Sequence, residues 1–235
     1  MEIAVKDLLT YLPLLLRGTG TTLMLGLGGL AISLVLGMLG AWGKLGSSRA
    51  GRRLANLYTT GIRSVPDLCW LLLFYFGAQT LLNNLGALTN LWGNYEIPPF
   101  MAGTLTIGIV FGAYMTETFR GAFQSIPKGQ FEAASAIGMT KSQAFRLITF
   151  PQLLGYALPS LGVNWMVLIK TTALVSIIGL QDVVYYGLSA GRATHNPFLF
   201  FLALMGIFLM LTSISNWLLS ALEKRYTRGR RIGQS

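Results

Sequence analysis

Long apolar runs separated by short polar segments dominate the chain and predict five membrane-spanning helices. A run of about 20 apolar residues is long enough to cross the hydrocarbon core of a bilayer, which is about 30 Å thick. The predicted spans are residues 21–42, 54–82, 100–119, 153–178 and 197–222. The pattern therefore predicts an all-α integral membrane protein whose transmembrane domain covers residues 19–223.

The N-terminal residues 1–18 contain a short apolar stretch that Pro13 interrupts. Glu2 and Asp7 stand where a signal peptide would be basic, and no small-residue cleavage site follows. We therefore interpret residues 1–18 as an interfacial helix that is retained.

The second predicted span, residues 54–82, carries an internal break. Pro66 interrupts the backbone hydrogen bonds, and Arg63 and Asp67 are costly in hydrocarbon unless they are paired or hydrated. Two interpretations stay open: the break faces protein or a water-filled cavity, or Arg63 pairs with Asp67 near the membrane surface and anchors the helix.

The longest polar segment between two predicted spans is residues 125–151, and its sequence predicts a helical hairpin. Gly138 suits a helix C-terminus, where the backbone adopts positive φ. Thr140 and Gln143 have the spacing of a capping box that begins a second helix. That helix should stop or bend at Pro151. A stiff hairpin of this kind, with a small apolar face, is suited to docking into a partner.

Composition and charge support a membrane protein and predict its topology. The chain of 235 residues is 53% hydrophobic, is only 11% charged and has a mean hydropathy of +0.57; soluble domains carry about 25% charged residues. The net charge is +10, and 13 of the 18 basic residues lie in the segments 44–53, 120–146 and 224–235, a distribution that membrane topology explains better than nucleic-acid binding does. Basic segments face the cytoplasm, so we expect a periplasmic N-terminus and a cytoplasmic C-terminus with a basic tail, residues 224–235.

The sequence shows no pattern of residues that is typical of an enzyme. There is no G-x-x-x-x-G-K-[ST] phosphate loop. Cys69 and His195 are each the single residue of their type, which argues against a disulfide or a zinc cluster. We expect no catalytic residue, metal site or cofactor; Cys69 should be a small core residue and His195 a solvated loop residue. If the protein is a transporter that needs energy, another polypeptide must supply that energy.

The hairpin also carries a family motif. Glu132-Ala133-Ala134, followed by Gly138, Ile148 and Pro151 at matching spacings, resembles the "EAA" motif of permease subunits in ATP-binding-cassette importers. Phe150 stands where the motif usually has Leu. From the spacing alone, an ordinary surface hairpin is the alternative. The resemblance implies that an ATPase-coupling segment is formed by Gly129, Gln130, Glu132, Ala133, Ala134 and Gly138.

The resemblance extends over nearly the whole chain. Residues 62–66, 117–121 and 170–174 are similar to segments of polar amino-acid permeases, above all the Q-type subunit of histidine/lysine/arginine/ornithine or arginine/ornithine importers. This implies a type I importer permease of the bacterial inner membrane that carries basic amino acids. The implied partners are a second permease subunit (M-type or a second copy), two ATPase subunits that bind ATP and Mg²⁺, a periplasmic amino-acid-binding protein and membrane lipid.

Polar residues in or near the spans are the candidates for substrate contact. The amide of Asn164 can satisfy either end of an amino acid. Lys170 could meet a carboxylate or could extend to the membrane surface. Asp67 or Glu117 could meet a cationic side chain, although each has an arginine nearby in the sequence. Asp182 could contact the binding protein or the outer gate.

Three other functions were weighed against this one. The same machinery could carry glutamine or glutamate, and a carboxylate facing the cavity would favour a cationic substrate instead. A stand-alone secondary transporter or channel would show inverted repeats with paired broken helices, whereas the chain has a single proline-interrupted span. A membrane enzyme is the weakest alternative because no cluster of reactive residues is present.

Overall fold

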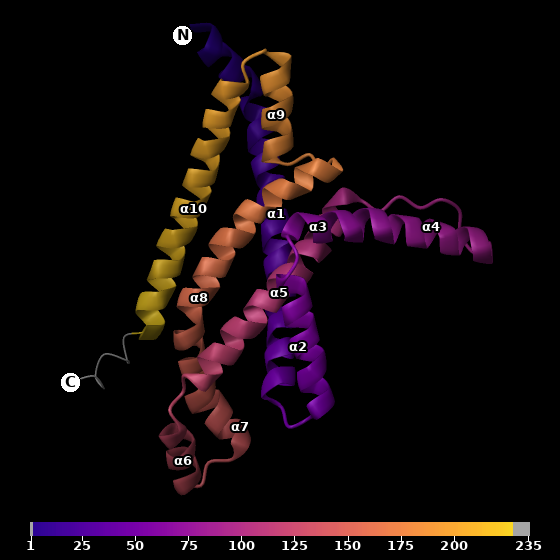
Figure 1. Cartoon of the computed structure of the whole chain (residues 1–235). Coiled ribbons are helices and arrows are strands. Elements are labelled where there is room, and N and C mark those ends of the chain that lie inside the picture. Colours follow the sequence, from indigo (N-terminus) through magenta and orange to yellow (C-terminus); the bar gives the residue numbers. More distant parts are fainter. Residues whose placement is uncertain (1, 228–235) are drawn as a thin grey trace.

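The computed structural model describes residues 2–227, and helices account for nearly all of them. The long helix α1 (Glu2–Leu45) runs the length of the molecule, and α5 (Pro99–Gln124) packs along it (Figure 1). The helix α8 (Phe150–Thr171) packs against α5, and α10 (Pro197–Thr227) packs against α8. No strand occurs in the described part of the chain.

Shorter elements connect these four helices. In chain order they are α2 (Arg49–Arg63), α3 (Asp67–Leu72), the π-helical turn η1 (Leu73–Gly77), α4 (Ala78–Thr89), α6 (Lys128–Ala136), α7 (Lys141–Ala144), the π-helical turn η2 (Phe145–Thr149), the 3₁₀ helix η3 (Thr172–Ile178) and α9 (Val183–Ala193).

Within the described residues, five helical segments are long and apolar enough to cross a membrane, which confirms the predicted all-α, five-span architecture. They are Lys6–Leu45, Asp67–Thr89, Pro99–Gln124, Lys141–Ile178 and Pro197–Lys224. The predicted basic tail lies mostly outside the described residues, because these end at residue 227.

The N-terminal residues do not form the separate helix that the sequence predicted. Residues 2–45 make one continuous α-helix that passes through Pro13. Leu15 is buried in a cluster with Val183 and Phe200, and the rings of Tyr11 and Phe200 are 5.6 Å apart. This packing on α9 and α10 supports the helix on both sides of the proline, which neighbouring helices make tolerable in membrane helices.

The second span begins later than predicted. The helix α2 ends at Arg63. The helices α3 and α4 then run roughly crosswise to α1 and extend away from it (Figure 1). Pro66 has no N–H and disfavours helical backbone at the residue before it, so the chain turns there. Arg63 does not pair with Asp67; its guanidinium lies 5.0 Å from the centre of the Tyr114 ring. Cys69 was predicted to be a core residue, and this was wrong: it is exposed on α3.

The predicted hairpin is present as α6 and α7. Gly138 has φ of +76°, and Thr140 and Gln143 form the capping box in both directions. The N–H groups of Gly138 and Met139 donate to the carbonyls of Ser135 and Ala134, which closes α6 as a Schellman motif. The second helix does not stop at Pro151, which lies in the first turn of α8, directly after η2.

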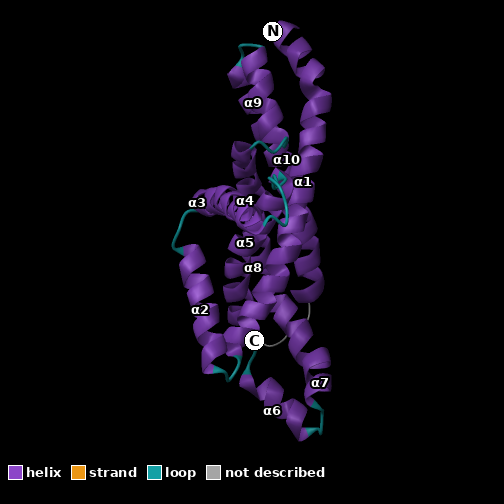
Figure 2. Ribbon diagram, turned by 90° about the vertical axis from the view of Figure 1, so that its right-hand side faces the viewer, coloured by secondary structure: helices purple, strands orange, loops and turns teal. Residues whose placement is uncertain are grey.

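The hairpin lies at one end of the molecule, and α9 lies at the other (Figures 1 and 2). The connection between α1 and α2 and the C-terminal end of α10 point toward the hairpin's end (Figure 1). The basic segments 44–53 and 120–146, which the charge pattern assigned to one side of the membrane, therefore lie toward the same end of the fold. Which side of the membrane this end faces stays a prediction.

Glycines on α1 allow α5 to approach closely. A Cβ added at Gly37 would lie 2.4 Å from the Met115 Cβ, and one at Gly40 would lie 2.2 Å from the Thr116 Oγ1. Helices in lipid associate through such close packing, because burial of apolar surface from water contributes little there. The α1–α5 contact is therefore set by these small residues.

A second close contact joins α1 to the start of α9. A Cβ at Gly18 would lie 2.7 Å from the carbonyl carbon of Asp182. Asp182 is fully buried and caps α9 by accepting from the Tyr185 N–H at 2.8 Å, while the Val183 N–H donates to the Thr22 hydroxyl. The second oxygen, Oδ2, accepts no hydrogen bond from the residues that the structure describes. Burial raises the pKa of Asp182 to about 6, although backbone hydrogen bonds lower it.

We expect Gly37→Ala to destabilise the protein by about 1–3 kcal/mol, because the added methyl overpacks the α1–α5 contact. Gly20→Ala is the matched control: it lies on the same helix, and no atom lies within 4 Å of its added Cβ. Its effect should stay within about 1 kcal/mol. Thermal unfolding of the purified membrane protein measures both, and equal midpoints would contradict the packing argument.

We expect Asp182→Asn to alter how stability depends on pH. The pKa of Asp182 in the folded protein, about 6, exceeds the ordinary value of 3.8, so the folded form binds more protons between these values. Stability contributed by Asp182 therefore falls as pH rises from about 4 to about 6. Relative to Asp182→Asn, which keeps a capping side chain, the wild type should lose up to about 3 kcal/mol across this range. Parallel pH profiles of unfolding for the two proteins would refute this.

Candidate coupling and translocation sites

The hairpin is fastened to the membrane helices on both sides. The ring of Phe131 on α6 lies 5.9 Å from that of Phe123 on α5. The amide of Gln152 on α8 donates to the side-chain oxygen of Gln130 at 3.2 Å. A force applied to α6 is therefore transmitted to α5 and to α8 through side chains as well as through the backbone.

The predicted coupling residues form an exposed surface on this hairpin. Ala134 is buried (2% exposed) on the inner side of α6, whereas the side chain of Ile137 is 71% exposed. The remaining predicted coupling residues are all exposed: Gly129, Gln130, Glu132, Ala133 and Gly138. Small side chains beside a large exposed apolar one make a surface that another protein can approach closely.

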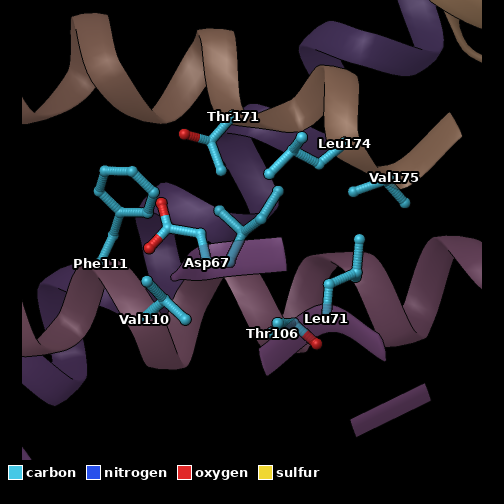
Figure 3. A pocket seen from close by; sticks show the side chains of 9 residues that line it. Asp67, Leu71, Thr106, Val110, Phe111, Thr171, Leu174 and Val175 are labelled. Carbon is cyan, nitrogen blue, oxygen red and sulfur yellow. The ribbon is translucent and has the colours of Figure 1, made fainter. Parts of the chain in front are cut away.

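Asp67, the first residue of α3, lines a small cavity between α3, α5 and the end of α8 (Figure 3). Its carboxylate lies between Phe111 of α5 and Thr171 of α8 (Figure 3). The remaining wall is mainly apolar, with Leu71 and Val110 among its members. The cavity volume is about 10 Å³, room for about one water molecule. The structure is therefore closed to a larger ligand at this point.

An open cleft lies beside this cavity, between α1, α2 and α5. Its volume is about 400 Å³, a size suited to a small ligand. Its lining is polar and charged: Lys44, Thr59, Thr60, Arg63, Ser64, Tyr114 and Glu117.

Glu117 is already paired on both of its oxygens. Lys44 donates to Oε1, and the Arg120 Nε donates to Oε2 at 2.8 Å. Lys44 also donates to the Thr59 hydroxyl at 2.6 Å, and Arg120 donates to Gln124 at 2.8 Å. The Glu117–Arg120 pair lies within α5, and the rest of the network ties α1 and α2 to α5. A carboxylate with two cationic partners has little capacity left for a cationic ligand.

The other predicted substrate residues do not converge on Asp67. The Asn164 amide donates to the Thr118 hydroxyl at 3.0 Å and so joins α8 to α5. Lys170 is exposed in an open groove between α8 and α10. Asp182 lies at the α1–α9 junction, outside the cavities that hold Asp67 and Glu117. His195 is exposed in the loop after α9, with φ of +54°.

Sequence reasoning missed residues that only the tertiary contacts reveal. Lys44 was counted with a basic loop, yet it pairs with a residue 73 positions later. Tyr114 lies in the apolar run of the third span and was not a candidate, yet its ring contacts the Arg63 guanidinium. Thr106, whose buried hydroxyl has no hydrogen-bond partner within residues 2–227, lines the Asp67 cavity. A search for polar residues inside the third span would have found Tyr114 and Thr106. Among the described residues, no group of three or more His, Cys, Asp or Glu is placed to hold a metal ion.

Comparison with known proteins identifies the family. Residues 33–228 match the family described as "Binding-protein-dependent transport system inner membrane component". The chain is 45% identical to the histidine/lysine/arginine/ornithine transport system permease protein of Escherichia coli (strain K12), over 92% of this chain and 94% of that protein. It is 38% identical to an octopine transport system permease protein of Rhizobium radiobacter, over 93% and 92%.

A solved structure agrees with these relatives. A chain of a structure titled "Crystal structure of an amino acid ABC transporter with histidines" superposes with a TM-score of 0.78 at 31% sequence identity, covering 93% of this chain and 96% of that chain. Together with the helical architecture, these matches show that the chain belongs to the family of binding-protein-dependent transport system inner membrane components and has the fold of a type I importer permease.

Proposed function

We propose that the chain is the permease subunit of an importer for basic amino acids in the bacterial inner membrane. Support comes from the family and from relatives whose names include histidine, lysine, arginine and ornithine. The observation that carries the choice of a cationic substrate is the carboxylate of Asp67. Asp67 is partly buried, lines a small cavity and has no ion-pair partner among the described residues.

The ionised carboxylate of Asp67 is unfavourable in free energy where it stands. An ionised group inside a membrane protein is expensive unless it is paired or hydrated. Asp67 shares its cavity with apolar side chains such as Leu71 and Val110. A lysine, arginine, histidine or ornithine side chain would supply the missing positive charge when the cavity opens. Glutamine would not, and glutamate would add a second negative charge.

Partner proteins would supply the energy that opens the Asp67 cavity. We infer that the exposed hairpin, α6 and α7, docks with an ATPase subunit that binds ATP and Mg²⁺, at the cytoplasmic end of the molecule. A periplasmic binding protein would then deliver the amino acid at the opposite end, near α9 and Asp182. A second permease subunit would complete the assembly, as either an M-type chain or a second copy. Asn164 and Lys170 stay candidates for further substrate contacts.

We expect Asp67→Asn to reduce arginine uptake by about 10- to 100-fold, since it removes one charge-assisted interaction with the substrate. Asp67→Glu, which keeps the carboxylate, should retain more activity. Uptake of radiolabelled arginine into proteoliposomes holding the whole complex measures this. Unchanged uptake by Asp67→Asn would eliminate the Asp67 site.

We expect Glu132→Ala to weaken docking of the ATPase subunit, and so to reduce the stimulation of ATP hydrolysis by the loaded binding protein, without harming the fold, because Glu132 is exposed on α6. Glu96→Ala is the control, since Glu96 is an exposed carboxylate outside the hairpin. ATPase activity of the purified complex, stimulated by the loaded binding protein, should fall at least about 10-fold for Glu132→Ala only. Equal stimulation in both variants would exclude Glu132 from the docking surface.

A further inference from the structure

We propose that Arg63 binds the α-carboxylate of the transported amino acid while Asp67 binds its side-chain cation. This inference rests on the proposed function and assigns the second end of the same substrate site. Arg63 and Asp67 lie at the two sides of the break between α2 and α3, so one turn of the chain carries both charges.

Arg63 is held in place without being neutralised. Its guanidinium lies 5.0 Å from the centre of the Tyr114 ring, a cation–π contact that orients the group but supplies no negative charge. In the described part of the chain, no carboxylate forms an ion pair with it. A guanidinium with free donors is suited to bidentate recognition of a carboxylate.

The other charged residues of the cleft form ion pairs with each other or with Arg120, and Arg63 does not take part in them. Lys44 and Glu117 also line this cleft, but they pair with each other, and Arg120 takes the second oxygen of Glu117. The network therefore has more positive than negative charge before Arg63 is added. A small anion entering the cleft would meet an excess of positive charge, with Arg63 as the cation that has no carboxylate partner.

An aromatic pair links this cleft to the Asp67 cavity. Tyr114 lines the cleft and Phe111 lines the cavity, and their ring centres are 5.6 Å apart on α5. Phe111 and Tyr114 are three residues apart, about 4.5 Å along the helix axis, so the cavity with Asp67 and the cleft with Arg63 border neighbouring positions on α5. Basic amino acids have the complementary shape: a carboxylate at one end and a cation at the end of an apolar chain, which the two rings can flank.

The cleft at Arg63 and the cavity at Asp67 differ in volume. The cleft at Arg63 has about 400 Å³, whereas the cavity at Asp67 has about 10 Å³. The site is therefore open at its carboxylate end and closed at its cation end in this structure.

The test compares arginine with agmatine, which is arginine without the α-carboxylate. Equilibrium binding of each compound is measured on the purified complex without the binding protein, for wild type, Arg63→Gln and Arg63→Lys. Arg53→Gln is the matched control, because it removes an exposed arginine from the same helix and does not line the cleft. Size-exclusion chromatography verifies that each variant assembles.

In wild type and Arg53→Gln we expect arginine to bind about 10- to 100-fold more tightly than agmatine. Arg63→Gln should lose this preference through weaker arginine binding, with agmatine binding unchanged, and Arg63→Lys should restore part of it. A preserved preference in Arg63→Gln, or an equal loss for both compounds, would overturn the role of Arg63. Failure of the wild-type complex to bind either compound would instead overturn the proposed substrate site itself.

Discussion

Close packing of α1 against α5 is the contact on which the other arrangements depend. Glycines such as Gly37 and Gly40 remove the side chains that would separate the two backbones. Since lipid provides little hydrophobic force between helices, this fit and the polar contacts that it permits must hold them together. The fit also brings Lys44 of α1 close to Glu117 of α5. Lys44 donates to Glu117 and to the Thr59 hydroxyl of α2, so it links α1 and α2 to α5. Without this approach, the cleft between these three helices would not form.

The helix α5 joins the two functional regions of the proposed mechanism. Phe111 and Tyr114 face the cavity and the cleft, and the helix ends at Gln124, a few residues before the hairpin. The hairpin contacts α5 and α8, which also borders the Asp67 cavity through Thr171. A partner that moves the hairpin would therefore move two walls of the substrate site together. Rigid-body movement of this kind is a common way to convert a docking event into a change of access.

Local sequence patterns predicted local structure well, but they did not predict contacts between residues far apart in the chain. The capping box that begins at Thr140 and the positive φ at Gly138 depend on neighbouring residues, so the sequence was sufficient to predict both. The pairing of Lys44 with Glu117 depends on how two distant helices meet, which periodicity does not encode. The continuation of α1 through Pro13 likewise depends on its packing against α9 and α10. For the candidate site, the sequence indicated Asp67 but not the cavity or its aromatic neighbours.

The central claim is that the hairpin controls access to the site beside Asp67, and Cys69 offers a direct probe of it. This single cysteine is exposed on α3, two residues after Asp67. The measurement is the rate of Cys69 alkylation by a maleimide, followed by mass spectrometry, with and without trapped ATP. The account predicts that ATP changes the rate in the wild-type complex and that Glu132→Ala removes this change. An identical ATP-dependent change in both complexes, or none in the wild type, would contradict it.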